Sequence, residues 1–204
     1  MALTEKLHDF ITTIELTSIS AEREQALQPL VDYLRDKVAQ SAPIQLTFIC
    51  THNSRRSCFA QVWAQVLAAY FGLENVQCFS GGTEATALPE QVVKTLRDSG
   101  LQVDQMTSGV NPKYHLTYAD DAHPVQLFSK TWQHHSNPKS HFAALMTCAE
   151  ASANCPVIPG AELRIPLPFE DPKHYDHTAQ QSAKYAAVNR QIATALYAVY
   201  SKIN

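Results

Sequence analysis

A short apolar stretch that runs directly into a polar loop constrains this chain more than any other feature. Residues 46–50 are mostly apolar and partly β-branched, which predicts a buried strand that ends at Cys50. A polar loop follows, and from Phe59 to Tyr70 apolar residues recur at helical spacing. A strand, a tight loop and a helix N-terminus together bind oxyanions, because backbone N–H groups and the helix dipole both favour negative charge there.

Cys50 opens this loop and Arg56 closes it, with five residues between them. A thiol beside such a positive cluster loses its proton readily, and the resulting thiolate is the nucleophile. Arg56 offers a planar fork of donors that suits a tetrahedral oxyanion. The competing interpretation is a core cysteine and a surface arginine, since a Cys-x5-Arg match alone arises by chance in many chains.

The loop resembles the phosphate loop of the low-molecular-weight tyrosine phosphatases and of the related thioredoxin-coupled arsenate reductases, which usually reads C-T-G-N-x-C-R-S. The positions that match are Cys50, Thr51, Asn53, Arg56 and Ser57. The resemblance implies an oxyanion site formed by Thr51, His52, Asn53, Ser54, Arg55, Arg56 and Ser57. It also implies that Ser80, at the glycine turn expected to end a second strand from Val76, lies near this loop.

Two loop residues depart from the family pattern, because His52 replaces the usual glycine and Arg55 the usual second cysteine. We expect Arg55 to raise the positive potential at the loop and His52 to narrow its mouth. The alternative is that both side chains point to solvent. Gln61 occupies the position of a glutamate in arsenate reductases that bind potassium, which argues against a cation site near Asn53 and Ser80.

A second informative stretch is an apolar strand that runs into Cys148, with Cys155 seven residues later and Pro156 after it. Two small buried residues or a zinc pair are the alternatives, although no second pair of ligands accompanies these cysteines. The arrangement resembles the redox segment of the thioredoxin-coupled arsenate reductases, which ordinary phosphatases of this fold lack. The small and polar residues of 149–154 predict a segment mobile enough to bring Cys148 first to Cys50 and then to Cys155.

A third stretch, from Leu167 to Pro172, contains an Asp-Pro pair after the predicted fourth strand. The family keeps its general acid at this place, so the resemblance gives that role to Asp171, with Glu170 as the neighbouring alternative. A carboxylic acid above the loop can protonate a leaving oxygen, and Pro172 restricts the backbone that directs it.

The order of predicted elements indicates an α/β fold: a small four-stranded parallel sheet with helices on both faces, similar to the low-molecular-weight phosphatases. Residues 1–43 read as an N-terminal helical extension that packs on the domain, with Ser20 capping its second helix and Pro29 kinking that helix or shifting its start. Residues 44–204 read as the phosphatase-like or arsenate reductase-like domain. Within it, an insertion at about 107–140 contains an expected hairpin of residues 114–118 and 125–128.

Composition and charge limit the partners and the cellular compartment that we expect for this chain. The net charge of −3 over 204 residues indicates no large basic surface, so we expect no nucleic-acid partner. No apolar run reaches membrane-spanning length, the N-terminus is too polar for a signal peptide, and five cysteines do not make a paired framework. We therefore expect a cytoplasmic protein without a membrane partner. Trp132, His134 and His135 suggest a solvated loop rather than a metal site, and we expect neither metal nor cofactor.

Two enzymatic functions and one non-enzymatic function fit these motifs. In the arsenate reductase, the resemblance implies that Cys50 attacks arsenate, Cys148 attacks Cys50, and Cys155 passes the oxidation to thioredoxin. In the tyrosine phosphatase, Cys50 carries a phosphoryl group from a phosphotyrosine or aryl phosphate, and Tyr175 would supply the aromatic wall of the cleft. An oxyanion-binding or redox-sensing module is the third reading, against which the complete set of Cys50, Arg56 and Asp171 argues.

Overall fold

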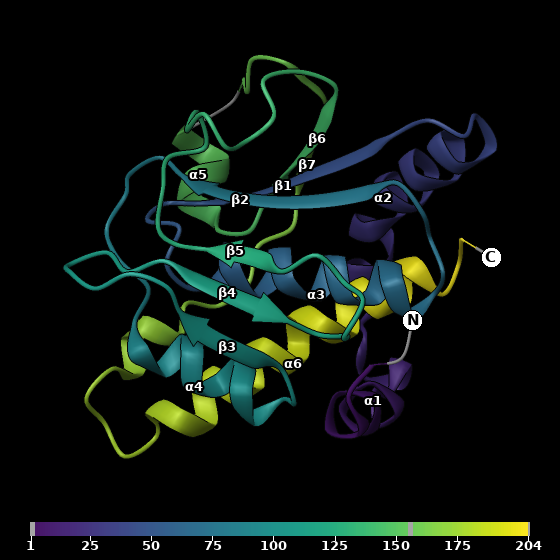
Figure 1. Cartoon of the computed structure of the whole chain (residues 1–204). Helices are drawn as coiled ribbons and strands as arrows, with labels where there is room; N and C mark the ends of the chain where they lie inside the picture. Colours follow the sequence, from purple (N-terminus) through teal and green to yellow (C-terminus); the bar gives the residue numbers. More distant parts are fainter. Residues whose placement is uncertain (1–2, 155–156, 204) are drawn as a thin grey trace.

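The protein is organised around a parallel sheet of four strands in the order β2-β1-β6-β7, seen in the upper half of Figure 1. The computed structural model describes residues 3–154 and 157–203. The four strands span Ile44–Cys50 (β1), Val76–Gly82 (β2), Phe142–Met146 (β6) and Ala161–Pro166 (β7). All three pairings are parallel, which confirms the predicted sheet and brings the carboxyl ends of the strands to one edge.

Helices cover both faces of this sheet, as the sequence predicts. Side chains such as Leu46 and Phe48 of β1 pack on one face with helices α3 (Arg56–Tyr70) and α6 (Gln181–Tyr200) in the main core. Alternate residues, including Ile49 of β1 and Met146 of β6, face the other side. There they form a smaller cluster with Ala151 of the short helix α5 (Ala149–Asn154).

The N-terminal arm consists of helices α1 (Glu5–Thr12) and α2 (Ala21–Ala39), with a 3-10 turn at Leu16–Ser18 between them. Its buried residues join the main core, and α2 packs against α6. The arm therefore packs as an extension of the domain's own core, as expected. Ser20 caps α2 by accepting a hydrogen bond from Arg23 N at 3.2 Å. The helix continues through Pro29, so that proline does not shift its start.

A second, antiparallel sheet lies below the first in Figure 1 and has the strand order β3-β4-β5. Strands β4 (Tyr114–Thr117) and β5 (Val125–Leu127) pair as the predicted hairpin. Strand β3 (Gln102–Gln105), which follows helix α4 (Glu90–Asp98), was not predicted. It has only four residues, of which only Val103 is buried, so it carries no alternating pattern long enough to recognise.

Strand β2 forms an outer edge of the parallel sheet, and side-chain amides bind its backbone. Gln65 on α3 donates to the carbonyl of Val76 and accepts from the N–H of Cys78, at 3.1 and 3.0 Å. Gln61, one helical turn earlier, donates to the carbonyl of Cys78 at 3.1 Å. Further along, Asn137 donates to the carbonyl of Ser80 at 2.9 Å.

The two glycines that follow Ser80 do not form the predicted turn, because both lie within strand β2. A Cβ added to Gly81 would lie 2.3 Å from the Cα of Trp132, and one added to Gly82 would lie 2.6 Å from the carbonyl oxygen of Thr51. Glycine is needed here because two other segments approach the strand closely. The Trp132 segment is therefore packed against the sheet rather than free in solvent.

Candidate active site

The predicted oxyanion loop lies at the carboxyl end of β1, between Cys50 and the start of α3 at Arg56. Asn53 has a positive φ of 47°, a conformation that asparagine tolerates better than most residues. This turn directs the N–H of Asn53 to the Sγ of Cys50 at 3.2 Å, and the Oγ of Ser57 lies 3.1 Å from the same sulfur. Two groups able to donate hydrogen bonds therefore surround a thiol that is only 3% exposed.

The side chain of Asn53 holds the loop from inside. Its Nδ2 donates to the Oγ of Ser57 at 2.9 Å, and its Oδ1 accepts from the backbone N–H of Lys130 at 3.0 Å. The loop is also fixed from outside, because the carbonyl of His52 accepts a hydrogen bond from Ser129 at 2.8 Å. A loop fixed on both sides keeps its donors oriented without rearrangement when an anion enters, which is the condition for electrostatic preorganisation.

Arg56 and Asp171 meet at the mouth of this loop. One amino group of Arg56 donates to the carbonyl of Phe169 at 3.1 Å, and the other donates to the carboxylate of Asp171. The remaining Asp171 oxygen accepts from the N–H of Lys173 at 3.0 Å, in the 3-10 helix Pro172–Tyr175. The Nε of Arg56 is buried and has no hydrogen-bond partner within the described chain.

Glu170, the alternative carboxylate, occupies a different position. It is exposed and lines a cavity together with residues of α2 and α6. Asp171 is the carboxylate that contacts Arg56, and its role as the acid stays a prediction.

Cys148 lies beside the loop, directly before helix α5. Its Sγ is 3.5 Å from the Oγ1 of Thr51, the residue after Cys50, and it accepts a hydrogen bond from Ala151 N at 3.3 Å. Cys148 and Cys50 also share one buried cluster. Burial raises the pKa of the Cys148 thiol above its ordinary value, against the opposing effects of Thr51, Ala151 and the Arg56 charge. The third predicted redox residue, Cys155, lies outside the described residues.

The segment between the two cysteines differs from the flexible connection that its small residues predict. Residues 149–154 form helix α5, whose carbonyl at Ser152 accepts a hydrogen bond from Arg164 of β7. Alanine supplies three of its six residues and has the highest helix propensity, which explains the helix.

Arg55 does not point to solvent, so that alternative was wrong, while its expected effect on the potential at the loop stays a prediction. Its guanidinium donates to the carboxylate of Asp176 and to the hydroxyl of Tyr185, both at 2.6 Å. Burial and the Asp176 carboxylate raise the pKa of the Tyr185 hydroxyl to about 12. Both partners are more than 120 residues away in the chain, so no local signal could reveal this network.

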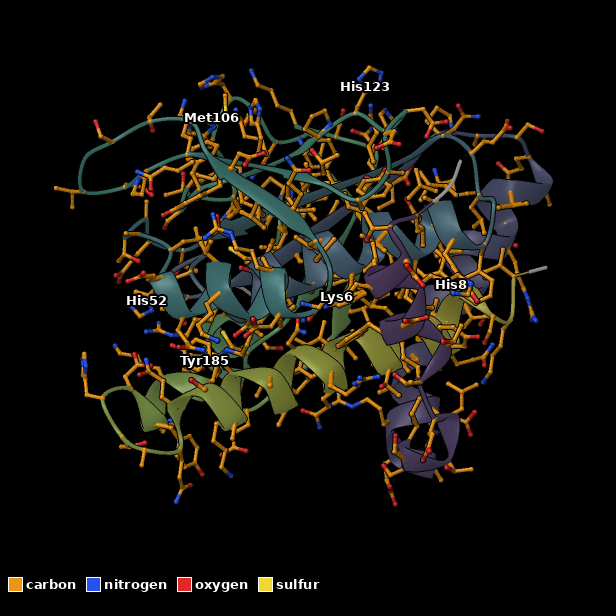
Figure 2. All side chains as sticks on the ribbon, turned by 60° about the horizontal axis from the view of Figure 1, so that its bottom comes forward. Lys6, His8, His52, Met106, His123 and Tyr185 are labelled. Carbon is orange, nitrogen blue, oxygen red and sulfur yellow. The ribbon has the colours of Figure 1, made fainter. Side chains whose placement is uncertain are left out.

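His52 remains partly exposed, with an Nε2 3.7 Å from a carboxylate oxygen of Glu84. Figure 2 shows His52 and Tyr185 at the same end of the molecule, with His8 of α1 toward the other end. The side chain of His52 therefore lies at the surface beside the loop. That it narrows the mouth of the loop stays a prediction.

Behind the loop lies a polar cluster that sequence reasoning identified only in part. Ser80 is buried and donates to Gln61 at 2.6 Å, but the described contacts of its hydroxyl do not include the loop. Lys130 was missed altogether. It is 5% exposed, its backbone binds Asn53, and its ammonium lies 4.7 Å from the centre of the Phe128 ring. Burial lowers the pKa of Lys130 to about 8.

Replacing Lys130 with methionine is expected to raise the free energy of unfolding at about pH 7 by on the order of 2–3 kcal/mol, because a buried ammonium loses its hydration. The folded pKa is about 8, and that of an unfolded lysine is about 10.4. Between these values the unfolded chain keeps a proton that the folded chain has released, so the stability of the parent protein rises with pH in this window. Denaturant unfolding at about pH 7 and pH 10 should show the advantage of the variant shrinking at the higher pH. Equal stabilities of the parent protein and the Lys130→Met variant at pH 7 would show that burying the Lys130 ammonium does not destabilise the fold.

Cys50 is expected to be alkylated by iodoacetamide before the other described cysteines near neutral pH, with phosphate or arsenate slowing the reaction. The N–H of Asn53 points to the sulfur of Cys50, whereas burial raises the pKa of Cys58 to about 12 and also raises that of Cys78. Timed alkylation followed by peptide mapping measures the order. If Cys58 reacted ahead of Cys50 and ignored the oxyanion, the loop would not be the anion site.

The fold and the loop together define a class. Residues 45–120 match the family model described as low molecular weight phosphotyrosine protein phosphatase. This part of the chain, which contains the Cys50 loop, is therefore similar to the low-molecular-weight phosphatase family. A solved structure of a low-molecular-weight phosphotyrosine phosphatase from Vibrio cholerae O395 has the same fold, with a TM-score of 0.50 at 16% identity over 76% of this chain and 93% of that one.

Curated relatives of this chain carry a more particular name. Arsenate reductase 2 of Staphylococcus haemolyticus is 24% identical over 149 residues, which cover 73% of this chain and 90% of that protein. The arsenate reductase of Bacillus licheniformis is 28% identical over 135 residues, covering 66% of this chain and 78% of the relative. Both the family and these relatives are enzymes, as the sequence predicts.

Within the described residues, no group of three or more histidine, cysteine, aspartate or glutamate side chains could hold a metal ion. Among the same residues, no helix is long and apolar enough to cross a membrane.

Proposed function

We propose that the protein is an arsenate reductase that uses Cys50 as its nucleophile and passes the oxidation through Cys148 and Cys155 to thioredoxin. The observation that carries this proposal is the second thiol beside the loop, with the Cys148 Sγ 3.5 Å from the Oγ1 of Thr51. Phosphoryl transfer through a cysteine needs one thiol, a cation and an acid, and has no use for a second thiol there. The reductase does require one.

The proposed first step is attack of the Cys50 thiolate on the arsenic atom of arsenate. The backbone of the loop and Arg56 hold the oxyanion, and the departing oxygen leaves as water after Asp171 protonates it. A bond forms between the Cys50 sulfur and arsenic(V). The contact of Arg56 with Asp171 places this carboxyl beside the oxyanion site. For the step the carboxyl must be protonated, and it exchanges its contact with Arg56 for one with the departing oxygen.

In the second step the Cys148 thiolate attacks the sulfur of Cys50. A disulfide forms, the sulfur–arsenic bond breaks, and its electron pair reduces arsenic(V) to arsenic(III), which leaves as arsenite. Cys155 then attacks Cys148, so that Cys50 is released as a thiolate and a Cys148–Cys155 disulfide remains for the dithiol of thioredoxin to reduce. Because burial raises the pKa of Cys148, little of it is thiolate at neutral pH, and we expect the second step to accelerate as pH rises.

Helix α5 bears directly on the last transfer. Its six residues separate Cys148 from Cys155 and span about 9 Å at the rise of an α-helix. A disulfide requires Cα atoms within about 7 Å. We therefore infer that α5 unwinds at least in part when Cys148 and Cys155 pair.

Phosphatase activity is the second candidate, because Cys50, Arg56 and Asp171 are sufficient for hydrolysis of an aryl phosphate. Tyr175, which the sequence suggests as an aromatic wall, lies in the 3-10 helix just after Asp171. Its ring lies 4.5 Å from the ammonium of Lys184. It lines the same cavity as Glu170, so its part in an aryl cleft at the loop stays a prediction.

Adding one equivalent of arsenate to the fully reduced protein separates the two functions. The reductase predicts about one equivalent of arsenite together with a disulfide that includes Cys148, mapped by mass spectrometry of peptides. A Cys50→Ser variant should yield neither. All cysteines still reduced and no arsenite, with aryl phosphate hydrolysed, would reject the reductase in favour of the phosphatase.

A further inference from the structure

A cavity of about 610 Å³ lies between the N-terminal arm, the turn that carries Asp171, and helix α6. Its wall includes Arg23 of α2, Glu170 and Pro172 on either side of Asp171, and Lys184 and Arg190 of α6. No residue of the Cys50 loop lines it. The volume falls within the range of about 300–1,000 Å³ that small-molecule sites occupy.

The charges on this wall do not balance. Three cations, Arg23, Lys184 and Arg190, face one carboxylate, that of Glu170, which leaves a net charge of +2 (three minus one). Glu170 is itself exposed, and none of the three cations forms an ion pair with a carboxylate of the described chain.

The hydrogen bonds of the two arginines go to neutral oxygens. Arg23 donates to the carbonyl of Pro168 at 2.6 Å. Arg190 donates to the carbonyl of Phe10 at 3.1 Å and to the hydroxyl of Thr13 at 2.9 Å. Both guanidinium groups are partly buried, and this desolvation lowers the pKa of each. Cations that lose water on folding usually gain an anionic partner, and these two have none within the described residues.

Between the charges the wall combines apolar side chains with uncharged polar ones such as Gln191 and Thr194. Pro172, Val188 and Ala195 are buried, and Tyr175 adds a ring whose centre lies 4.5 Å from the ammonium of Lys184. Cations around apolar surface suit a compact molecule that has an apolar body and more than one negative group.

We propose that this cavity, which we call the arm pocket, binds a small organic anion with an apolar body and at least two negative groups held by Arg23, Lys184 and Arg190. The proposal goes beyond arsenate reduction and gives the N-terminal arm a binding role. The arm pocket adjoins the acid turn: Arg23 lies 4.7 Å from the centre of the Phe169 ring, and the carbonyl of Phe169 accepts from Arg56.

Isophthalate, a flat aromatic dianion, is a suitable probe, and isophthalamide is its uncharged match of nearly the same shape. We would titrate both into the Cys50→Ser variant, whose pocket is intact while the proposed chemistry is disabled, and follow binding by calorimetry and by the NMR signals of Tyr175 and Val188. Isophthalate should bind with a dissociation constant below about 1 mM, weaken with added salt, and shift both reporters. Isophthalamide should not bind.

Variants assign the binding to the cations. Lys184→Met removes a side chain whose described contact is the Tyr175 ring, so it should fold normally and weaken isophthalate binding about tenfold. Arg23→Met should weaken it at least as much, whereas Lys173→Met, which removes an exposed charge outside the pocket, should leave it unchanged. Absence of isophthalate binding, equal binding of isophthalamide, unchanged affinity in Lys184→Met, or NMR shifts confined to the Cys50 loop would each overturn the proposal.

Discussion

Replacing Arg56 with lysine is expected to lower kcat by about 100- to 1,000-fold for both arsenate reduction and aryl phosphate hydrolysis. Lysine keeps the positive charge but not the planar fork. Arg56 uses two amino groups at once, one on the carbonyl of Phe169 and one on Asp171. A single ammonium cannot hold the acid turn and an oxyanion in the same geometry. Steady-state kinetics with both substrates measure the loss.

Arg35→Lys is the matched control for that experiment. Arg35 also binds a carbonyl through two nitrogens, at 3.1 and 2.7 Å from the oxygen of Lys202, but it joins α2 to the end of α6. Its replacement should leave both activities unchanged, while thermal melting reports whether either variant has lost its fold. Near-normal turnover by a folded Arg56→Lys variant would remove Arg56 from the proposed site.

Replacing Cys148 with serine should abolish multiple-turnover arsenate reduction while aryl phosphate hydrolysis continues. A serine hydroxyl can keep the contact with Thr51, but it cannot accept the oxidation from Cys50. The phosphatase reaction would proceed, because it requires only Cys50, Arg56 and Asp171. Coupled assays with thioredoxin and thioredoxin reductase measure the first activity, and release of the aryl alcohol measures the second.

Two further cysteine variants make that result specific. Cys155→Ser should complete about one turnover and then stop with Cys50 linked to Cys148. Cys78→Ala, which removes a buried thiol on β2, should keep both activities. Continued arsenate turnover by the Cys148→Ser variant would exclude Cys148 from the relay. Arsenate would still be a substrate of the protein in that case.

Much of the fold could be predicted because its signals are local. The apolar strand before Cys50, the strand before Cys148 and the cap at Ser20 each depend on a few neighbouring residues, and the structure contains all three. Strand β3 escaped prediction because it is short and mostly exposed. The glycines of β2 were wrongly assigned to a turn. They are needed because Trp132 and Thr51 approach the strand closely, and this tertiary packing leaves no signal in the neighbouring sequence.

The candidate site divides in the same way. The positions of Cys50, Arg56 and Asp171 follow from strand ends, and the structure pairs Arg56 with Asp171 and places Cys50 at the start of the loop that ends at Arg56. The pairing of Arg55 with Asp176 could not be foreseen, because it joins residues 121 positions apart. The burial of Lys130 was equally hidden, since a lysine in a polar stretch ordinarily indicates a solvated surface.

The amides along β2 have a consequence for how this protein behaves at high concentration. An uncovered edge strand offers a row of free N–H and C=O groups on which a second molecule can add its own strand. Here Gln61, Gln65 and Asn137 already occupy backbone groups at three successive outward-facing residues of that edge. These side chains therefore oppose the addition of another molecule's strand at the β2 edge of the sheet.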